Sequence, residues 1–213
     1  LNNTTGSSNT ADGLRSLFSN TTGNNNTALG SGADVTSGGL SNATAIGSGA
    51  QVDISNKVRI GNTSVTVIEG QVSFSFPSDA RFKYNINNSV PGLDFIIKLK
   101  PVTYYFDTEK LDHYSKTGDI CNSIVRLVSY TKPIQLHTGF VAQDVEKIAK
   151  ELGYDFDGLH IPQNNRDHYS LAYSQFIMPL VKAVQEQQEM IQQQGELIKT
   201  IQKELKELKE KIK

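Results

Sequence analysis

The chain is short of several residue types that folded domains commonly use. It holds one cysteine, Cys121, and no tryptophan, so an internal disulfide and a metal site built from cysteines alone are excluded. Cys121 is expected to be a simple packing residue. No apolar run approaches the ~20 residues that a membrane-spanning helix needs, and no secretory leader is recognisable. We expect a fragment cut from the C-terminal end of a longer protein, so the missing leader says little about the compartment.

The chain also lacks an excess of either charge, because 21 Lys and Arg residues stand against 22 Asp and Glu residues and the formal net charge is −1. This near balance predicts no basic face for nucleic acid and no attraction to an anionic membrane. The histidines do not suggest a ligand pair, since His160 and His168 lie eight residues apart (168 − 160) with Pro162 between them. We expect no metal, no cofactor, and neither a nucleic-acid nor a membrane partner, and we interpret the histidines as ordinary surface or loop residues.

Hydrophobic residues make up only 37% of the chain, and they are unevenly spread. None of the six prolines precedes Pro77, whereas all eight tyrosines lie between Tyr84 and Tyr173. The middle of the chain can therefore bury a core, and the two ends need partners to do so. This uneven composition divides the chain into three segments, residues 1–76, 77–176 and 177–213.

The first segment repeats with a fixed period. The run Asn3–Gly6 returns as Asn20–Gly23, and Thr27–Ala33 returns as Thr44–Ala50 with isoleucine for leucine, each 17 residues on (20 − 3 = 44 − 27 = 17). A fixed period predicts a stack of like units, and small apolar residues between Gly and Asn turns favour short β-strands. One such stack exposes strand edges, which other chains would cover. Composition alone would favour a disordered linker instead.

Two stretches of this segment read NATAIGSGA at residues 42–50 and VRIGNTSVTVIEG at residues 58–70. They resemble the heads of trimeric autotransporter adhesins. The resemblance implies three chains wound into a left-handed parallel β-roll, or a β-prism, and it concerns shape more than function. Between Val65 and Phe76 apolar and polar residues alternate, which predicts a strand that runs up to Pro77.

The central segment mixes helical and strand patterns, and we expect an α+β domain. A short helix is predicted over residues 93–99, and a strand rich in β-forming residues over 102–106. A further helix over 146–152 should end at Gly153. We interpret residues 107–137 as an insertion or a long hairpin.

The last segment carries a heptad repeat without a break. Its alternating spacing of three and four predicts a coiled coil of roughly 55 Å. Isoleucine at both kinds of core position favours three strands, and Gln187 and Gln194 would fix the register. A single amphipathic helix docked on its own domain is the alternative. The predicted core positions are Ile177, Leu180, Val184, Gln187, Ile191, Gln194, Ile198, Ile201, Leu205, Leu208 and Ile212.

Both ends of the chain thus require association, and each points to three copies. The predicted fold is mixed and elongated, a homotrimer with three successive parts. A repetitive β-roll or β-prism comes first, a central α+β domain follows, and a long C-terminal helix joins a trimeric coiled coil.

A serine and a lysine mark the junction between the first two segments. Ser78 and Lys83 lie five residues apart (83 − 78), so a turn between them would bring the side chains together. A serine hydroxyl becomes a nucleophile when a base takes its proton, and lysines serve as that base when burial lowers their pKa. The spacing alone fits two surface polar residues equally well.

Four separated motifs give this pair its context. The chain reads SDARFKYNI from Ser78, LDFIIKLKPVTY from Leu93, GFVAQDV from Gly139 and YSL from Tyr169, followed by the heptads. In this order the motifs resemble the endosialidase-type intramolecular chaperone family, which is also present in myelin regulatory factors. The resemblance covers about residues 78–213.

This resemblance implies a module that trimerises, helps an upstream β-rich fibre segment to fold, and then cuts itself off immediately before the serine. Ser78 would be the nucleophile, Lys83 the general base, and Asp79 an acidic residue that aligns the turn or the lysine. The cut would fall between Pro77 and Ser78, which makes the module a single-turnover serine endopeptidase. Its setting would be a phage tail fibre or a bacterial cell-surface fibre.

Two alternatives stay open. Pro77 stiffens the acyl side of the bond, which either holds the carbonyl in place or misaligns it, so the chain could be a permanent, uncut trimerisation tip. It could also be a fibre tip that binds a cell-surface receptor or glycan through Tyr104, Tyr105 and Tyr154.

Overall fold

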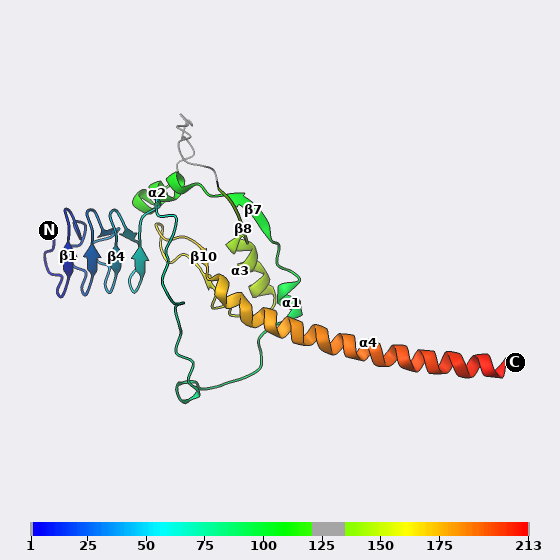
Figure 1. Cartoon of the computed structure of the whole chain (residues 1–213). Coiled ribbons are helices and arrows are strands. Elements are labelled where there is room, and N and C mark those ends of the chain that lie inside the picture. The colour runs from blue at the N-terminus through cyan, green and yellow to red at the C-terminus, as the bar shows by residue number, and fades with distance from the viewer. Residues whose placement is uncertain (1, 121–134, 213) are drawn as a thin grey trace. The chain divides into compact units, whose positions relative to one another are not determined.

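The computed structural model describes residues 2–120 and 135–212 (Figure 1). The chain forms two compact units. Residues 121–134, which include Cys121 and form part of the stretch expected to be an insertion or hairpin, lie outside the described residues. Each unit has its own buried apolar cluster. The first unit comprises Leu1–Phe76, Thr103–His137 and Ile161–Tyr169, and the second comprises Pro77–Val102, Thr138–His160 and Ser170–Lys213.

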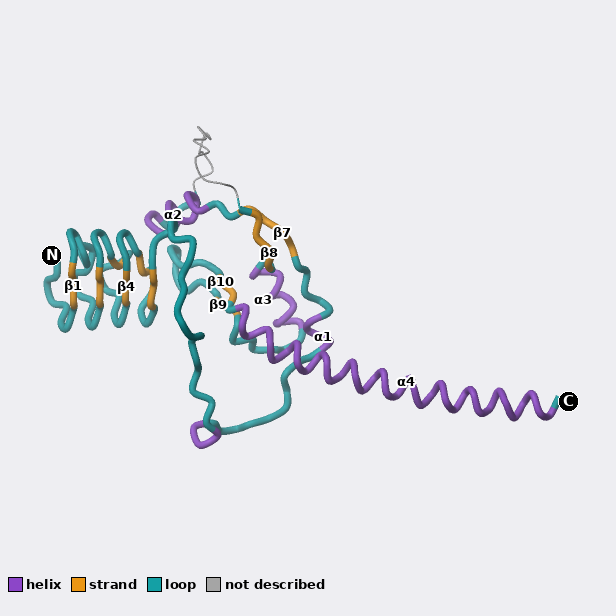
Figure 2. The backbone as a smooth tube through the Cα atoms, in the orientation of Figure 1, coloured by secondary structure: helices purple, strands orange, loops and turns teal. Residues whose placement is uncertain are grey.

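The first unit opens with a ladder of short parallel strands, drawn side by side in Figure 2. Thr10 lies opposite Thr27, and Thr27 lies opposite Thr44, so the 17-residue sequence period is the step between neighbouring strands. The last step is shorter, because Thr44 lies opposite Val58 (58 − 44 = 14). The expected stack of short strands is confirmed. Its main sheet has the order β1 (Thr10–Asp12), β2 (Thr27–Leu29), β4 (Thr44–Ile46) and β6 (Val58–Ile60), and β3 (Asp34–Val35) pairs in parallel with β5 (Gln51–Val52).

Small apolar side chains and asparagines fill the inside of the ladder. Ala28 and Ala45 sit in register and are buried. Asn26 is fully buried, and its side chain accepts from the Ala43 N–H at 2.9 Å and donates to the Leu40 carbonyl at 2.6 Å. Since these polar groups have partners, burying them costs little. An ordered ladder thus replaces the disordered linker that composition alone would favour.

Glycine is required where neighbouring repeats come closest. Gly30 has φ +128°, a conformation that other residues rarely adopt. A Cβ at this position would lie 2.7 Å from the backbone carbonyl carbon of Gly47 in the next repeat. The recurrence of glycine in the sequence period therefore reflects a backbone-to-backbone contact.

The strand predicted for Val65–Phe76 is wrong for the single chain. From β6 to α1 (Leu93–Ile96) the chain is described throughout, and its only regular element is the 3₁₀ turn η1 (Ala80–Phe82). The alternating apolar side chains are present but exposed, with Phe74 88% exposed. A strand needs a neighbour to bond its N–H and C=O groups, and none of the described residues supplies one here.

The core of the second unit is aromatic. Phe95 of α1 is fully buried, with the ring centres of Tyr154 and Phe156 at 5.3 and 5.2 Å and that of Phe176 at 6.2 Å. Burying a side chain of this size contributes about 1.5–3 kcal/mol. Around it lie α3 (Ala142–Glu151), β9 (Leu159–His160), β10 (Ser170–Leu171) and η2 (Tyr173–Phe176).

The helices predicted over residues 93–99 and 146–152 are confirmed with shifted bounds. The first ends at Ile96, and the second begins at Ala142. Gly153 follows the second helix with φ +61°, as a helix-ending glycine should.

The strand predicted over residues 102–106 is confirmed as β7 (Val102–Tyr105), which pairs with β8 (Leu136–Gly139). The stretch expected to be an insertion or long hairpin begins instead with a helix, α2 (Thr108–Thr117). Asp107 caps this helix by accepting from the Lys110 N–H at 2.9 Å. Gly118 ends it with φ +77°.

The C-terminal helix α4 (Ile177–Lys211) runs for 35 residues, which is roughly 52 Å at 1.5 Å per residue. Its first turns pack on α1, where Pro179 and Ala183 are buried and Glu186 Oε2 accepts from the Leu93 N–H at 2.8 Å. The chain is thus mixed α and β with a long C-terminal helix, as expected. None of the helices within the described residues has the length and apolar character to cross a membrane.

Candidate functional site

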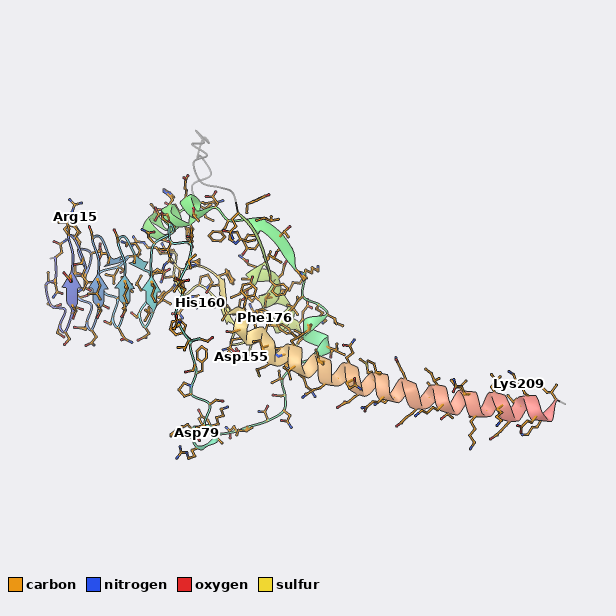
Figure 3. The ribbon with its side chains drawn as sticks, in the orientation of Figure 1. Arg15, Asp79, Asp155, His160, Phe176 and Lys209 are labelled. Carbon is orange, nitrogen blue, oxygen red and sulfur yellow. The ribbon has the colours of Figure 1, made fainter. Side chains whose placement is uncertain are left out.

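The residues from Ser78 to Lys83 form one tight turn. Asp79 precedes η1 and caps it, since its Oδ1 accepts from the Arg81 N–H at 2.9 Å. The Lys83 N–H closes the turn by donating to the Ala80 carbonyl at 3.1 Å. Aspartate before a helical turn satisfies N–H groups that would otherwise lack partners. The sequence therefore folds back on itself between the serine and the lysine; Asp79 is marked in Figure 3.

This turn brings the two predicted catalytic side chains together. The Nζ of Lys83 donates to the Oγ of Ser78 at 2.7 Å. Both side chains are exposed in the single chain. For catalysis this bond would run the other way, with the Ser78 hydroxyl donating to a neutral Lys83 amine. The two side chains lie within hydrogen-bond distance, and the chain's described residues do not enclose them.

Asp79, the third predicted site residue, contacts Arg81. The guanidinium Nε and Nη2 donate to its Oδ2 at 2.9 and 2.6 Å. This side-chain pairing raises the pKa of Arg81. The same pairing, followed by the bond from the Arg81 N–H, lowers the pKa of Asp79. The carboxylate thus stays ionised and holds the turn. Arg81 also lies over the Phe82 ring, 5.7 Å from its centre.

Large apolar side chains flank the turn on both sides of the chain. Phe74 and Phe76 precede it and are 88% and 76% exposed, while Phe82 and Tyr84 within and after it are 77% and 87% exposed. Side chains of this size are normally buried. Their common exposure around Ser78 marks a surface that lacks its cover.

The predicted coiled-coil positions are likewise exposed. On α4, Ile191, Ile198 and Ile201 are 54%, 55% and 52% exposed, and the remaining predicted core positions are also exposed. The face that packs on α1 contains Pro179 and Ala183, which belong to a different stripe of the helix. The heptad stripe is therefore left uncovered by the part of the chain that the structure describes.

The aromatic residues considered for receptor or glycan contact differ in their surroundings. Tyr105 is 65% exposed, and Tyr104 is half-buried and stacks on His137 with ring centres 5.6 Å apart. Tyr154 packs edge-on against Phe95 in the core. These three side chains thus have unlike roles, and Tyr154 works as a packing residue.

A second cluster, which the sequence pattern did not reveal, lies in the first unit. The Lys57 Nζ is 2.8 Å from Asp53 Oδ1 and 3.7 Å from Asp167 Oδ1. The His168 Nδ1 lies 3.6 Å from the other oxygen of Asp53. Both carboxylates are buried, at 5% and 0% exposure. No spacing in the sequence could have signalled this group, because more than a hundred residues separate its two halves.

Burial lowers the pKa of His168, and the positive charge of Lys57 adds to this effect. The imidazole is therefore mainly neutral at neutral pH. Asp53, Asp167 and His168 could offer ligand atoms to a metal ion, all within 4.8 Å of one another. The Lys57 ammonium already lies beside both carboxylates and supplies the positive charge, so we treat the cluster as an ion-pair group.

Comparison with protein families places the turn in a known context. Residues 78–154 match the family model described as the chaperone of endosialidase. The expected resemblance to endosialidase-type chaperones is confirmed. The endosialidase chaperone match begins at Ser78 itself and includes Lys83, and the β-ladder and α4 lie outside it. Comparison with curated proteins and with solved structures gave no significant match.

Proposed function

We propose that this chain is the C-terminal trimerisation and intramolecular chaperone module of a fibre or adhesin-like protein, and that it releases itself by cutting the Pro77–Ser78 bond. One observation carries the proposal. The Lys83 Nζ lies 2.7 Å from the Ser78 Oγ, at the first residues of the match to the chaperone of endosialidase. A nucleophile and a base within hydrogen-bond distance are the minimum that such a cut requires.

The proposed reaction uses the chain itself and one water molecule. Neutral Lys83 takes the proton of the Ser78 hydroxyl while that oxygen bonds to the carbonyl carbon of Pro77. The C–N bond between Pro77 and Ser78 then breaks, and the proton passes from Lys83 to the leaving Ser78 nitrogen. The resulting ester is hydrolysed by water, which leaves a carboxylate on Pro77 and free amino and hydroxyl groups on Ser78.

Asp79 would act on this reaction through the backbone. Its carboxylate caps the turn and bonds to Arg81, which keeps Ser78 and Lys83 at the two ends of one turn. We therefore assign Asp79 a positioning role, in which it does not touch the reacting atoms.

Assembly into a homotrimer is part of the proposal. An apolar stripe exposed along a 35-residue helix is what a coiled-coil seam presents before its partners are added. Isoleucine at Ile191, Ile198 and Ile201 favours three strands over two. In the ladder, partner chains arranged as a β-roll or β-prism would cover the strand edges. Residues 1–76, 77–176 and 177–213 would then be the β segment, the chaperone domain and the coiled coil.

Assembly would also enclose the Ser–Lys pair. Phe76 and Phe82, both exposed in the single chain, would pack against other copies and exclude water from the turn. Lysines act as bases only as neutral amines, a form that apolar enclosure favours. The cut would thus follow trimer formation, and the upstream β-rich segment would be held until it is folded. We place such a module in a phage tail fibre or a bacterial cell-surface fibre.

The mass of the folded protein under denaturing conditions tests the cut. We expect a fragment that begins at Ser78, with full loss of cutting in Ser78→Ala and a fall of roughly 10²–10⁴-fold in Lys83→Ala, the usual contribution of a general base. Lys83→Arg keeps the positive charge without supplying a base, so it should fail as Lys83→Ala does.

Matched controls come from side chains outside the pair. Ser89→Ala and Lys98→Ala change exposed or half-exposed residues of the same types and should cut normally. If folded wild-type material contains only full-length chains of 23.4 kDa, the self-cutting module is refuted and the permanent trimerisation tip takes its place. A fragment that still forms in Ser78→Ala would overturn the assignment of the nucleophile.

A further inference from the structure

The proposed cut would divide the first compact unit between the two fragments, because that unit contains segments from both sides of Ser78. The first unit contains the β-ladder and also Ile161–Tyr169, a loop from far beyond Ser78. Cutting the Pro77–Ser78 bond would therefore leave the ladder packed on a segment of the other fragment. Covalent separation and physical release are thus two different events for this chain.

Polar contacts join this loop to the end of the β3–β5 ladder. The Asn164 Nδ2 donates to the Asp53 carbonyl at 3.0 Å, and Arg166 donates to the Thr36 carbonyl. Thr36 and Asp53 follow directly on β3 and β5, and the Thr36 N–H donates to the Val52 carbonyl at 2.8 Å. The loop thus satisfies the carbonyl groups at which the two strands end.

Charge reinforces these contacts from both sides. Lys57 lies between two buried carboxylates. One belongs to Asp53, which also precedes the cut, and the other belongs to Asp167 of the loop. Without Asp167 the lysine would lose one partner, and without Lys57 two carboxylates would face each other in a poorly solvated place. Removing one member of a buried charge pair is far more costly than the pair is favourable.

The loop is organised by its own hydrogen bonds. Asp167 accepts from the N–H groups of Gln163 and His168, both at 2.9 Å. Asn164 Oδ1 accepts from the Asp167 N–H at 3.0 Å, and the Tyr114 hydroxyl donates to the Asp167 carbonyl at 3.2 Å. These partners all lie beyond Ser78. The fragment that begins at Ser78 can therefore hold the loop in shape by itself, which favours binding because less order is lost on association.

We propose that the loop Ile161–Tyr169 is a docking surface for the end of the β-ladder, and that it keeps the two fragments bound to each other after the Pro77–Ser78 bond is cut. This inference rests on the proposed function for the cut itself. It assigns the chaperone fragment a second task, as a non-covalent holder of the segment that it has folded. Release then requires a separate step that opens the loop.

Native size-exclusion chromatography, with denaturing mass measurement of each peak, tests the inference on the full chain. We expect both fragments of the cut wild type in one peak. Lys57→Met should weaken their association by roughly 30-fold or more, as loss of one partner of a buried charge pair does, so that the fragments separate on dilution. Lys57→Arg should restore co-elution, and normal cutting in Lys57→Met would show that the variant folds.

Lys98→Met serves as the control. It removes an ion pair with Glu151 (3.9 Å) that lies wholly within the fragment beginning at Ser78, so co-elution should be unchanged. Wild-type fragments that elute apart, or Lys57→Met fragments that stay together as tightly as wild type, would overturn the docking surface.

A chain that does not cut itself can still be tested for retention. A protease recognition site inserted after Gly70, in the exposed segment before the turn, allows the chain to be opened by an added protease. Co-elution of the two pieces would then support the docking surface although the proposed cut had failed. Separation of the pieces would refute it independently.

Discussion

Asp79 shows how a single capping residue can organise a local turn. Its carboxylate caps the turn through Arg81, and the turn places Lys83 against Ser78. The sequence predicted that these two side chains meet if the chain turns between them. The spacing of five residues could not predict whether it turns, because that depends on the cap.

The ion-pair cluster marks the opposite limit of prediction at this scale. Asp53 and Lys57 are four residues apart, and their pairing is a local matter. Asp167 and His168 join them only through the fold. No local pattern distinguishes these two residues from ordinary loop residues, and this is why the sequence alone predicts a loop role for His168.

His168 should make the docking of the loop sensitive to pH. Burial first, and then Lys57 with a smaller effect of Arg59, lowers its pKa, while Asp53 and Asp167 oppose them. The opened state has the ordinary pKa of about 6.5 and therefore takes up a proton more readily than the docked state. The stabilisation is fully present above pH ~6.5 and is lost as the pH falls through the lower, docked-state pKa.

We therefore expect amide hydrogen exchange in the loop Ile161–Tyr169 to speed up between pH 7.5 and pH 5, after correction for the intrinsic rates. His168→Gln, which cannot take up a proton, should flatten this response. An equally steep response in His168→Gln would show that another group is responsible.

Among the elements, those with a strong local period were predicted best. The 17-residue repeat gave the strand register of the ladder, since Thr10, Thr27 and Thr44 lie opposite one another. The strand expected over Val65–Phe76 did not form because a strand needs a neighbour to pair with, and the described residues supply none. The helix α2 was missed although Asp107 and Gly118 are recognisable cap residues.

Gly30→Ala should destabilise the ladder. The left-handed φ of +128° alone costs a side chain about 1–3 kcal/mol, and the new Cβ would meet the Gly47 backbone at 2.7 Å. Thermal unfolding of the full chain, in a Ser78→Ala background that keeps it whole, measures the loss. Gly39→Ala is the control, because its Cβ would meet only Thr22 Oγ1 at 3.6 Å; equal melting of both variants would contradict the role of the close contact.

For the whole molecule, the main feature is apolar surface and unpaired strand edges that are exposed at several places. The heptad stripe of α4, the flanks of Ser78 and the open strand edges of the ladder each lack a partner among the described residues. Association of like chains would cover all of them together. The sequence predicted this need from its periods, and the expected number of three chains rests on residue choice in the heptads and on the resemblance of the first segment.

Ile191→Glu should prevent the assembly. It would place a carboxylate from every copy in the apolar seam, where each unpaired ion costs several kcal/mol. Light scattering of the Ser78→Ala chain should give about three times the chain mass of 23.4 kDa. The double variant Ser78→Ala, Ile191→Glu should give a mass close to that of a single chain. Gln193→Glu adds the same charge two residues away on the outer face and should leave the trimer intact. A monomer or dimer mass without Ile191→Glu would overturn the homotrimer.

The packing of α4 on α1 has a consequence for the order in which a coiled coil would form. Starting a helix is the unfavourable step, with a nucleation constant of roughly 10⁻³. Here Pro179, Ala183 and Glu186 tie the first turns to α1, so we expect nucleation within one chain before it meets another. Figure 3 marks the two ends of the helix by Phe176 and Lys209. Pairing should then zip from the anchored end toward Lys209, which makes the start of the helix the checkpoint for correct register.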